Sequence, residues 1–305
     1  MNQLGALMLG VAVVACGGGA SNGDVSGDGA DAAVVDAPDA PPGWEMLVGR
    51  SWSVPAGSSD TYKCTRIKMD HDVWISGFRA VAPTGTHHTV VTISSTATPL
   101  GDYDCNVGSL DYQMLYASGV NTDELRFPAG VAMQVKAGQY INLNLHLFNA
   151  TDGEITGTSG ILIKTMDAAA VVHPADMVFA GTMDLTIPSD GQPHDVLGGC
   201  TTPRDWNVFT LWPHMHQYAT HQKVTVTLPG QAQESLLDIP FTFTEQRNYP
   251  DVAKAIPKGS RLDVTCTYVN NSGSTISWGD SSTAEMCFTG MYKWPAGGTL
   301  FDCSR

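Results

Sequence analysis

The chain has 305 residues, of which 43% are hydrophobic, so it can bury the core of one large domain or of two domains of ordinary size. The formal net charge is -14, and no basic face of the kind that phosphate contacts require is visible, so we expect no nucleic-acid partner. Part of this acidity is local, because one stretch without Lys or Arg holds Asp24, Asp28, Asp31, Asp36 and Asp39.

The amino terminus is typical of a bacterial lipoprotein signal. Residues 4–14 form an apolar run that is too short to span a bilayer. Small residues then precede Cys16, so residues 1–16 are predicted to be a signal peptide and Cys16 the lipidated residue. No Lys or Arg precedes the run, and the alternative is an ordinary secretory signal in which Cys16 is incidental. Gly17 carries no acidic retention cue, so we expect an anchor in the outer membrane of the cell envelope.

Residues 17–43 are predicted to be a disordered tether. They are rich in Gly, Ala, Asp and Pro and contain no aromatic residue. Such a segment cannot bury enough apolar surface to fold. The folded body is therefore expected to begin at Trp44.

Six cysteines follow Cys16, namely Cys64, Cys105, Cys200, Cys266, Cys287 and Cys303. An even number in an exported chain predicts three disulfides. The alternative, buried free thiols, is disfavoured in an oxidising compartment. The sequence alone leaves the connectivity open.

The body from Trp44 onward has the pattern of short β-strands. Residues 89–93 are wholly β-branched, and residues 140–147, 223–228 and 261–268 alternate apolar and polar side chains with period two. Turn signals containing Gly, Pro, Asn or Asp separate these runs. We therefore predict an all-β fold of antiparallel sheets arranged as sandwiches or jelly rolls.

A domain boundary is predicted between residues 165 and 172. Residues 161–165 have the pattern of a closing strand, and residues 168–170 form a short connector. This division gives an amino-terminal sandwich over residues 44–167 and a carboxyl-terminal sandwich over residues 168–305. No sequence repeat relates the two halves.

His214 and His216 form a His-x-His motif. On a strand, residues i and i+2 point to the same face, so the two rings can converge on one metal ion. Pro213 just before them predicts a sheet edge or a strand start. The alternatives are a surface pair without a ligand role, and a cupin site. The cupin site is disfavoured because Thr220 and His221 occupy the positions where a carboxylate is needed.

Met286 is the candidate third ligand beside this motif. A thioether is a soft ligand that favours copper over zinc, iron(II) or calcium. A lone Met is more often core filler. Here, however, a disulfide from the adjacent Cys287 to Cys266 would fix the strand and aim the sulfur. His214, His216 and Met286 are therefore the candidate catalytic ligands, with open positions left for dioxygen and substrate.

His87, His88 and His146 form a second candidate metal site. Adjacent residues on a regular strand point to opposite faces, so His87 and His88 need a bulge, which Gly85 permits. His146 lies in an apolar alternating strand and would otherwise be a buried structural histidine. The alternative ion for three histidines is zinc with water as its fourth ligand. No role is predicted for His71, His173, His194 or His221.

Taken in order, these motifs resemble a known family. His87-His88, His146, His214-Met215-His216 and Glu285-Met286-Cys287 are similar to the ligand motifs of the copper type II, ascorbate-dependent monooxygenases, over about residues 45–305. The resemblance implies two packed β-sandwich domains with one copper in each, facing a solvent-filled cleft. It implies an electron-transfer copper on the first three histidines and a catalytic copper on the other three ligands. Ascorbate would supply electrons, and dioxygen would convert a C–H bond to C–OH.

The resemblance also implies the disulfides and a change of substrate. Its cysteine pairs would be Cys64–Cys105, Cys266–Cys287 and Cys200–Cys303. The peptide-hydroxylating members carry an Arg and an Asn that bind the substrate carboxylate, where this chain has Trp212 and Phe288. We therefore predict that Trp212 and Phe288 line a pocket for an apolar or aromatic small molecule and that peptidylglycine is not the substrate.

Two other kinds of protein fit parts of the pattern. The same pair of sandwiches could bind copper for storage, sensing or delivery without catalysis. A structural adhesion sandwich would make the histidines incidental, and the complete six-ligand set argues against it. In each case we expect a monomer attached to the membrane through its lipid.

Overall fold

The computed structural model describes residues 40–58, 60–94, 96–106, 113–119, 122, 124–279 and 281–304. In these residues the secondary structure is almost entirely β-strand, with one 3-10 turn, η1 (Ala168–Ala170). The all-β prediction is therefore confirmed. The predicted signal peptide with Cys16, and the tether up to residue 39, lie outside the described residues. No helix in the described part is long and apolar enough to cross a membrane.

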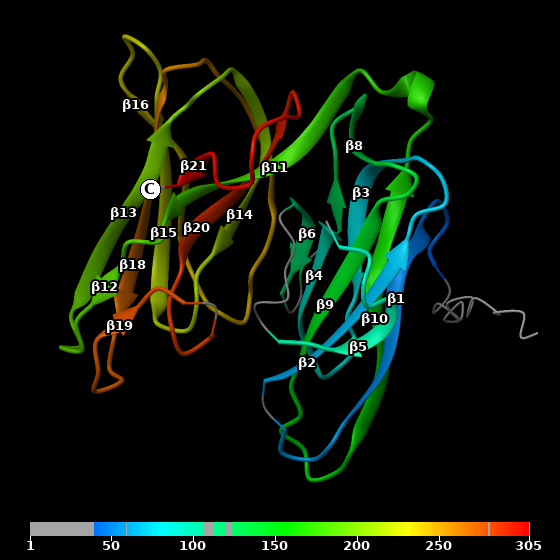
Figure 1. Cartoon of the computed structure of the whole chain (residues 1–305). Coiled ribbons are helices and arrows are strands. Elements are labelled where there is room, and N and C mark those ends of the chain that lie inside the picture. The colour runs from blue at the N-terminus through cyan, green and yellow to red at the C-terminus, as the bar shows by residue number, and fades with distance from the viewer. Residues whose placement is uncertain are drawn as a thin grey trace, which may run out of the picture. The chain divides into compact units, whose positions relative to one another are not determined.

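The largest sheet contains strands from both halves of the chain (Figure 1). In spatial order its strands are β1 (Glu45–Val54), β10 (Ile155–Thr165), β3 (Val73–Val81), β8 (Val131–Val135), β11 (His173–Thr182), β20 (Cys287–Trp294), β14 (Trp206–His214) and β17 (Tyr249–Ile256). Two short strands join it, β7 (Leu125–Arg126) on β3 and β21 (Cys303–Ser304) on β11. Neighbouring strands within this sheet run antiparallel, except that β11 runs parallel to β8 and to β21.

Smaller antiparallel sheets complete each half (Figure 1). The amino half adds five strands in the order β5 (Gly101–Asp104), β2 (Thr61–Lys68), β9 (Tyr140–Leu147), β4 (Thr86–Ser94) and β6 (Gln113–Ser118). The carboxyl half adds β13 (Pro193–Thr201), β18 (Arg261–Val269), β15 (Ala219–Thr227) and β16 (Gln233–Pro240). A separate pair consists of β12 (Thr186–Ile187) and β19 (Ile276–Ser277).

The period-two pattern of the sequence sets which side chains reach the core. In β18 the buried and half-buried residues alternate strictly, as expected for a strand with one core-facing side. Strand β9 is buried along almost its whole length, although it also alternates in polarity. It lies between β2 and β4, and its polar face, which includes Asn144 and His146, lines a pocket instead of open solvent.

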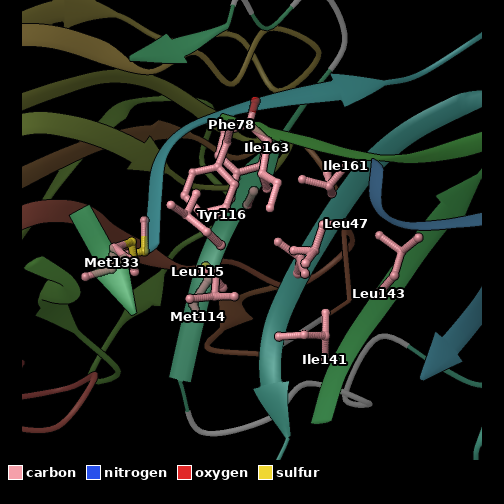
Figure 2. Close-up of a cluster of buried hydrophobic side chains, with 14 of the residues drawn as sticks. Leu47, Phe78, Met114, Leu115, Tyr116, Met133, Ile141, Leu143, Ile161 and Ile163 are labelled. Carbon is pink, nitrogen blue, oxygen red and sulfur yellow. The ribbon is translucent and has the colours of Figure 1, made fainter. Parts of the chain in front are cut away.

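The amino half is stabilised by an apolar core between its two sheets. Figure 2 shows side chains from both sheets in this core, among them Leu47, Ile161 and Ile163 from β1 and β10, and Ile141 and Leu143 from β9. Phe78 and Tyr116 stack there with their ring centroids 5.1 Å apart. Each aliphatic side chain buried in this way contributes about 1.5–3 kcal/mol relative to exposure.

The predicted boundary falls inside one compact unit. The turn η1 lies at residues 168–170, where the connector was expected. However, β8 pairs directly with β11 on the other side of it, and the described residues from 40 to 304 cluster together. The amino-half core also includes carboxyl-half residues such as Phe179 and Tyr292. A second apolar core belongs to the carboxyl half alone.

Three disulfides are present, and their pairing is the one that the resemblance implied. Cys64 in β2 is bonded to Cys105, which follows β5. Cys200 in β13 is bonded to Cys303 in β21, and Cys266 in β18 is bonded to Cys287 at the start of β20. The last two bonds each join the four-stranded sheet to the large sheet, so they fix the two layers of the carboxyl half against each other.

Candidate metal centre

His87, His88 and His146 come together on two neighbouring strands. His88 in β4 lies opposite His146 in β9, and the register of this strand pair shifts between Thr86 and His88. Gly85, just before β4, has a φ of +101°, a conformation that suits glycine. The predicted irregularity at the histidine pair is therefore confirmed, and it lets two adjacent histidines approach the same point.

The three imidazoles present their Nδ1 atoms to one another. The Nδ1 separations are 3.0 Å for His87 and His88, 3.3 Å for His87 and His146, and 3.4 Å for His88 and His146. The nearest point equidistant from the three nitrogens lies in their plane, about 1.9 Å from each, and points just above the plane reach the roughly 2.0–2.1 Å of a zinc–imidazole bond. Among the described residues, these three form a group whose possible ligand atoms all lie within 4.8 Å of one another. The donor set therefore fits a metal ion of the copper or zinc type.

Asp60 fixes the orientation of His146. The Nε2–H of His146 donates to the Asp60 carboxylate at 2.9 Å, so its Nδ1 carries the lone pair that a metal needs. The ring of Tyr62 stacks on His146, with centroids 4.6 Å apart and planes inclined by 4°. No sequence signal marked Asp60, because it is a single acidic residue just before β2.

The histidines of this cluster are held in their neutral forms. Burial, assisted by the neighbouring His146, lowers the pKa of His87 to about 4. Burial also lowers the pKa of His88 and that of His146. Neutral imidazoles at pH 7 have lone pairs available for a metal ion.

His214 and His216 lie at the end of a strand, and this corrects one expectation and part of another. Strand β14 ends at His214, so His216 lies in the following loop and not on the strand. Pro213 is not at a strand start, because it is the penultimate residue of β14. It does lie at a local sheet edge, because β14 pairs with β17 only as far as Leu211, while Pro213 still pairs with Thr289 of β20. Proline is tolerated there because the strand has a partner on one side only at this position.

The Nδ1 atom of each of these histidines is hydrogen-bonded. Their ring centroids are 5.4 Å apart, and their planes are inclined by 88°. The Nδ1 of His214 bonds to the side-chain oxygen of Gln246 at 2.9 Å, and the Nδ1 of His216 bonds to the carbonyl of Ala284 at 3.1 Å. Because Nδ1 is engaged in both rings, Nε2 is the candidate ligand atom of each. Burial lowers the pKa of His216 to about 4.

Glu285 ties Met286 to the His214-x-His216 segment. Its buried carboxylate accepts hydrogen bonds from the backbone N–H of His216 at 2.8 Å, of Tyr218 at 2.7 Å and of Met286 at 3.3 Å. Burial raises the pKa of Glu285 to about 7, although the backbone donors act in the opposite direction. No role was predicted for Glu285, although its place in the Glu285-Met286-Cys287 motif, next to a candidate ligand, is a sequence signal for it.

The two clusters line a single pocket. Its volume is about 90 Å³, and five of the six predicted ligands line it, namely His88, His146, His214, His216 and Met286. Phe243, in the loop between β16 and β17, packs with its ring centroid 5.0 Å from His87, 5.5 Å from His88 and 6.0 Å from His216. An aromatic side chain therefore lies between the clusters, where the resemblance implied solvent. Phe243 and Gln246 were both missed, because neither has a local sequence signal.

The two predicted substrate residues have different positions. Trp212 lines the pocket and stacks on His214, with centroids 4.9 Å apart. Phe288 is buried in the core and is not among the described lining residues. Its ring packs against Phe179 and over Gly181, which leaves no room there for a side chain. The assignment of Phe288 to the pocket is therefore corrected.

The other four histidines lie outside this centre. Three of them pair with aspartates, as His71 with Asp70, His194 with Asp190 and His221 with Asp238. The fourth, His173, stacks on Trp294 with ring centroids 5.2 Å apart. Each of the four therefore has a local interaction of its own.

Comparisons with known proteins do not identify a family. The sequence matches no protein-family model and no curated protein. Solved structures with some likeness include a secreted protein of Eubacterium rectale (8% identity, 80% of this chain, 69% of that chain, TM-score 0.23). Another is an allantoicase (11% identity, 79% of this chain, 78% of that chain, TM-score 0.21). A third is the PBCV-1 protein VP54, fitted into a cryo-EM reconstruction of the virophage Sputnik (8% identity, 81% of this chain, 93% of that chain, TM-score 0.25). At such TM-scores these likenesses carry no argument about fold or function.

Proposed function

We propose that this chain is an exported, copper-dependent monooxygenase that hydroxylates a C–H bond of a small uncharged molecule. The observation that supports this most strongly is the convergence of the six predicted ligands on one place. Five of them line the same pocket, and the ring of the sixth, His87, contacts two of those five. The proposal includes two copper ions, dioxygen as co-substrate and a lipid anchor at Cys16.

Each candidate copper position has its own set of donor atoms. The Nδ1 atoms of His87, His88 and His146 would hold one ion, and they already lie at the separations that a metal requires. Nε2 of His214, Nε2 of His216 and the sulfur of Met286 would hold the other, where the thioether favours copper. When bound, copper supplies one-electron chemistry and the activation of dioxygen.

The chain itself orients the ligands and places apolar groups beside them. Gln246 and the Ala284 carbonyl fix the rings of His214 and His216, and Glu285 holds the backbone of His216 and Met286 together. Phe243 packs an apolar ring against His88 of one cluster and His216 of the other. Such fixed partners and apolar packing reduce the reorganisation that a reaction at the site requires.

The pocket favours a neutral substrate. Its apolar lining includes Val90, Met114, Ala117, Trp212 and Phe243. None of its described lining residues is a Lys, Arg, Asp or Glu, so a carboxylate-ended peptide finds no ionic anchor. An apolar or aromatic molecule gains instead from burial against Trp212 and its neighbours.

The first test is the copper stoichiometry of the full chain, for the wild type and for Met286→Ala. Two bound coppers that fall to about one, or a clear loss of Cu(I) affinity at one site, are expected for the variant. Met183→Ala is the matched control, because Met183 is an exposed methionine outside the pocket. Zinc in place of copper, or an unchanged Met286→Ala protein, would remove the basis of the proposal.

Catalysis is tested separately from binding. Copper-loaded protein with a reductant and small aromatic or aliphatic candidates should consume dioxygen and release hydroxylated product. Two tightly bound coppers without substrate-dependent dioxygen uptake would favour the non-catalytic copper-binding reading.

A further inference from the structure

A second recess lies against the three-histidine cluster. Its volume is about 280 Å³, and its lining includes Gly85, His87, Phe148, Ala150, Thr151 and Ile155. None of its described lining residues belongs to the pocket of the two clusters. The cluster can therefore be reached from two sides, through His88 and His146 on one and through His87 on the other.

The surface of this recess is apolar and uncharged. Phe148 is 48% exposed, and Ala150 is exposed beside it. The polar residues of the loop are engaged internally: Asn149 donates to the carbonyls of Val54 and Gly153, and Thr151 donates to Asn149. No described lining side chain is a Lys, Arg, Asp or Glu. The recess thus offers the exposed ring of Phe148 beside His87, and its described lining holds no charged group that could bind an anion.

The acidity of the chain also disfavours an anionic donor. Part of the net charge of -14 lies in residues 24–39, but the chain as a whole is acidic, and none of the described lining residues of the recess is a cation. The ascorbate anion, which the resemblance implies as electron donor, is therefore poorly matched to this entrance. A planar neutral molecule that can stack on Phe148 is well matched.

We propose that this recess binds the electron donor and that the donor is a neutral aromatic diol of the hydroquinone class. This inference rests on the proposed function, because the electrons are destined for copper. One hydroquinone gives up two electrons in two single transfers and releases its two hydroxyl protons to water. It leaves as the quinone, and each electron converts one Cu(II) to Cu(I).

His87 provides the contact between donor and cluster. His87 lines the recess, and its Nδ1 lies 3.0 Å from that of His88 and 3.3 Å from that of His146. A donor against His87 is therefore separated from the candidate copper position by one imidazole ring. Because the other pocket stays free, donor and substrate are expected not to compete.

The test is anaerobic stopped-flow reduction of the copper-loaded full chain, followed by loss of the Cu(II) signal. We expect hydroquinone to reduce the protein faster than ascorbate does at matched driving force, with a rate that saturates. Ala150→Trp, which fills the recess, should slow hydroquinone about tenfold or more without changing copper stoichiometry. Ala129→Trp, at an exposed turn outside the recess, is the control and should have no effect. A faster reaction with ascorbate, or an unaffected Ala150→Trp protein, would overturn the proposal.

A second measurement separates this inference from the proposed function. The copper-free chain is mixed with resorcinol, the isomer of hydroquinone that cannot be oxidised to a quinone, and saturation-transfer NMR detects its binding. Binding that is lost in Ala150→Trp but kept in Ala129→Trp supports the recess even if copper loading fails. No binding to the wild type, or equal binding to both variants, contradicts it whatever metal the protein holds.

Discussion

The disulfide beside Met286 makes a quantitative prediction. Cys266 and Cys287 are both fully buried, and the bond between them closes a loop with a sequence separation of 21. By loop-closure entropy, removing it with Cys266→Ala/Cys287→Ala should lower the free energy of unfolding by about 3 kcal/mol. The bond joins β18 to the first residue of β20, directly after Met286. The variant should therefore also weaken the Met286 site.

The comparison variant is Cys64→Ala/Cys105→Ala. Its bond closes a longer loop, with a separation of 41, so the expected loss is larger, at about 4 kcal/mol. It lies in the amino half and makes no connection to β20. Stability and Cu(I) affinity should thus respond differently to the two changes. Loss of the Cys64–Cys105 bond should lower stability more, but only loss of the Cys266–Cys287 bond should weaken Cu(I) binding at the Met286 site.

The measurements are urea denaturation of the copper-free full chain and competition for Cu(I) with a chromophoric chelator. The expected result for Cys266→Ala/Cys287→Ala is a lower unfolding midpoint together with weaker binding at one site, while the protein is still folded. Unchanged Cu(I) affinity in this variant would show that the disulfide does not position Met286. If both variants lost Cu(I) affinity at the Met286 site equally, the effect would not come from the disulfide next to Met286, and the argument that this bond positions Met286 would be refuted.

Other consequences of the structure can be measured in the same way. The hydroxyl of Tyr268 donates to the Met286 carbonyl at 2.7 Å, so Tyr268→Phe should cost about 1–3 kcal/mol of unfolding free energy in a urea titration and reduce Cu(I) binding. The pKa values of His87 and His216 in the folded chain are about 4, below the usual 6.5. As the pH falls, these histidines therefore bind protons in the unfolded chain before they do so in the folded chain. The copper-free protein should accordingly lose stability as pH falls from 6.5 to 4, and His216→Asn should flatten that dependence in urea titrations at several pH values. A glycine-extended peptide offered to the copper-loaded protein with reductant should yield no hydroxyglycine by mass spectrometry, because Trp212 replaces a cationic anchor.

Much of the fold and part of the site follow from local sequence patterns. The period-two alternation of residues 140–147 and 261–268 located β9 and β18, and the His87-His88 pair beside Gly85 required the bulge that is present. These features depend on a few neighbouring residues. The disulfide pairing was available only through resemblance, since cysteine counts leave the partners open.

The remaining features depend on contacts between distant segments. Asp60 meets His146, Phe243 meets His87 and His88, and Gln246 meets His214 only after the sheets have formed. Of the two positions predicted for Pro213, the local sheet edge is present and the strand start is not, because a proline near a strand end and one at a strand start have the same local sequence. Phe288 was misplaced because its ring packs over Gly181, a residue more than a hundred positions away.

The pairing of β8 with β11 makes the two halves of the chain depend on each other for folding. Fragments cut at the connector would each expose an unpaired strand, and the amino fragment would lack Phe179 and Tyr292 from its core. Neither fragment is expected to stay in solution by itself. When the two fragments are produced together, their complementary strand edges should let them reassemble. Metal binding would then be regained only on reassembly, so it could report that the two fragments have met.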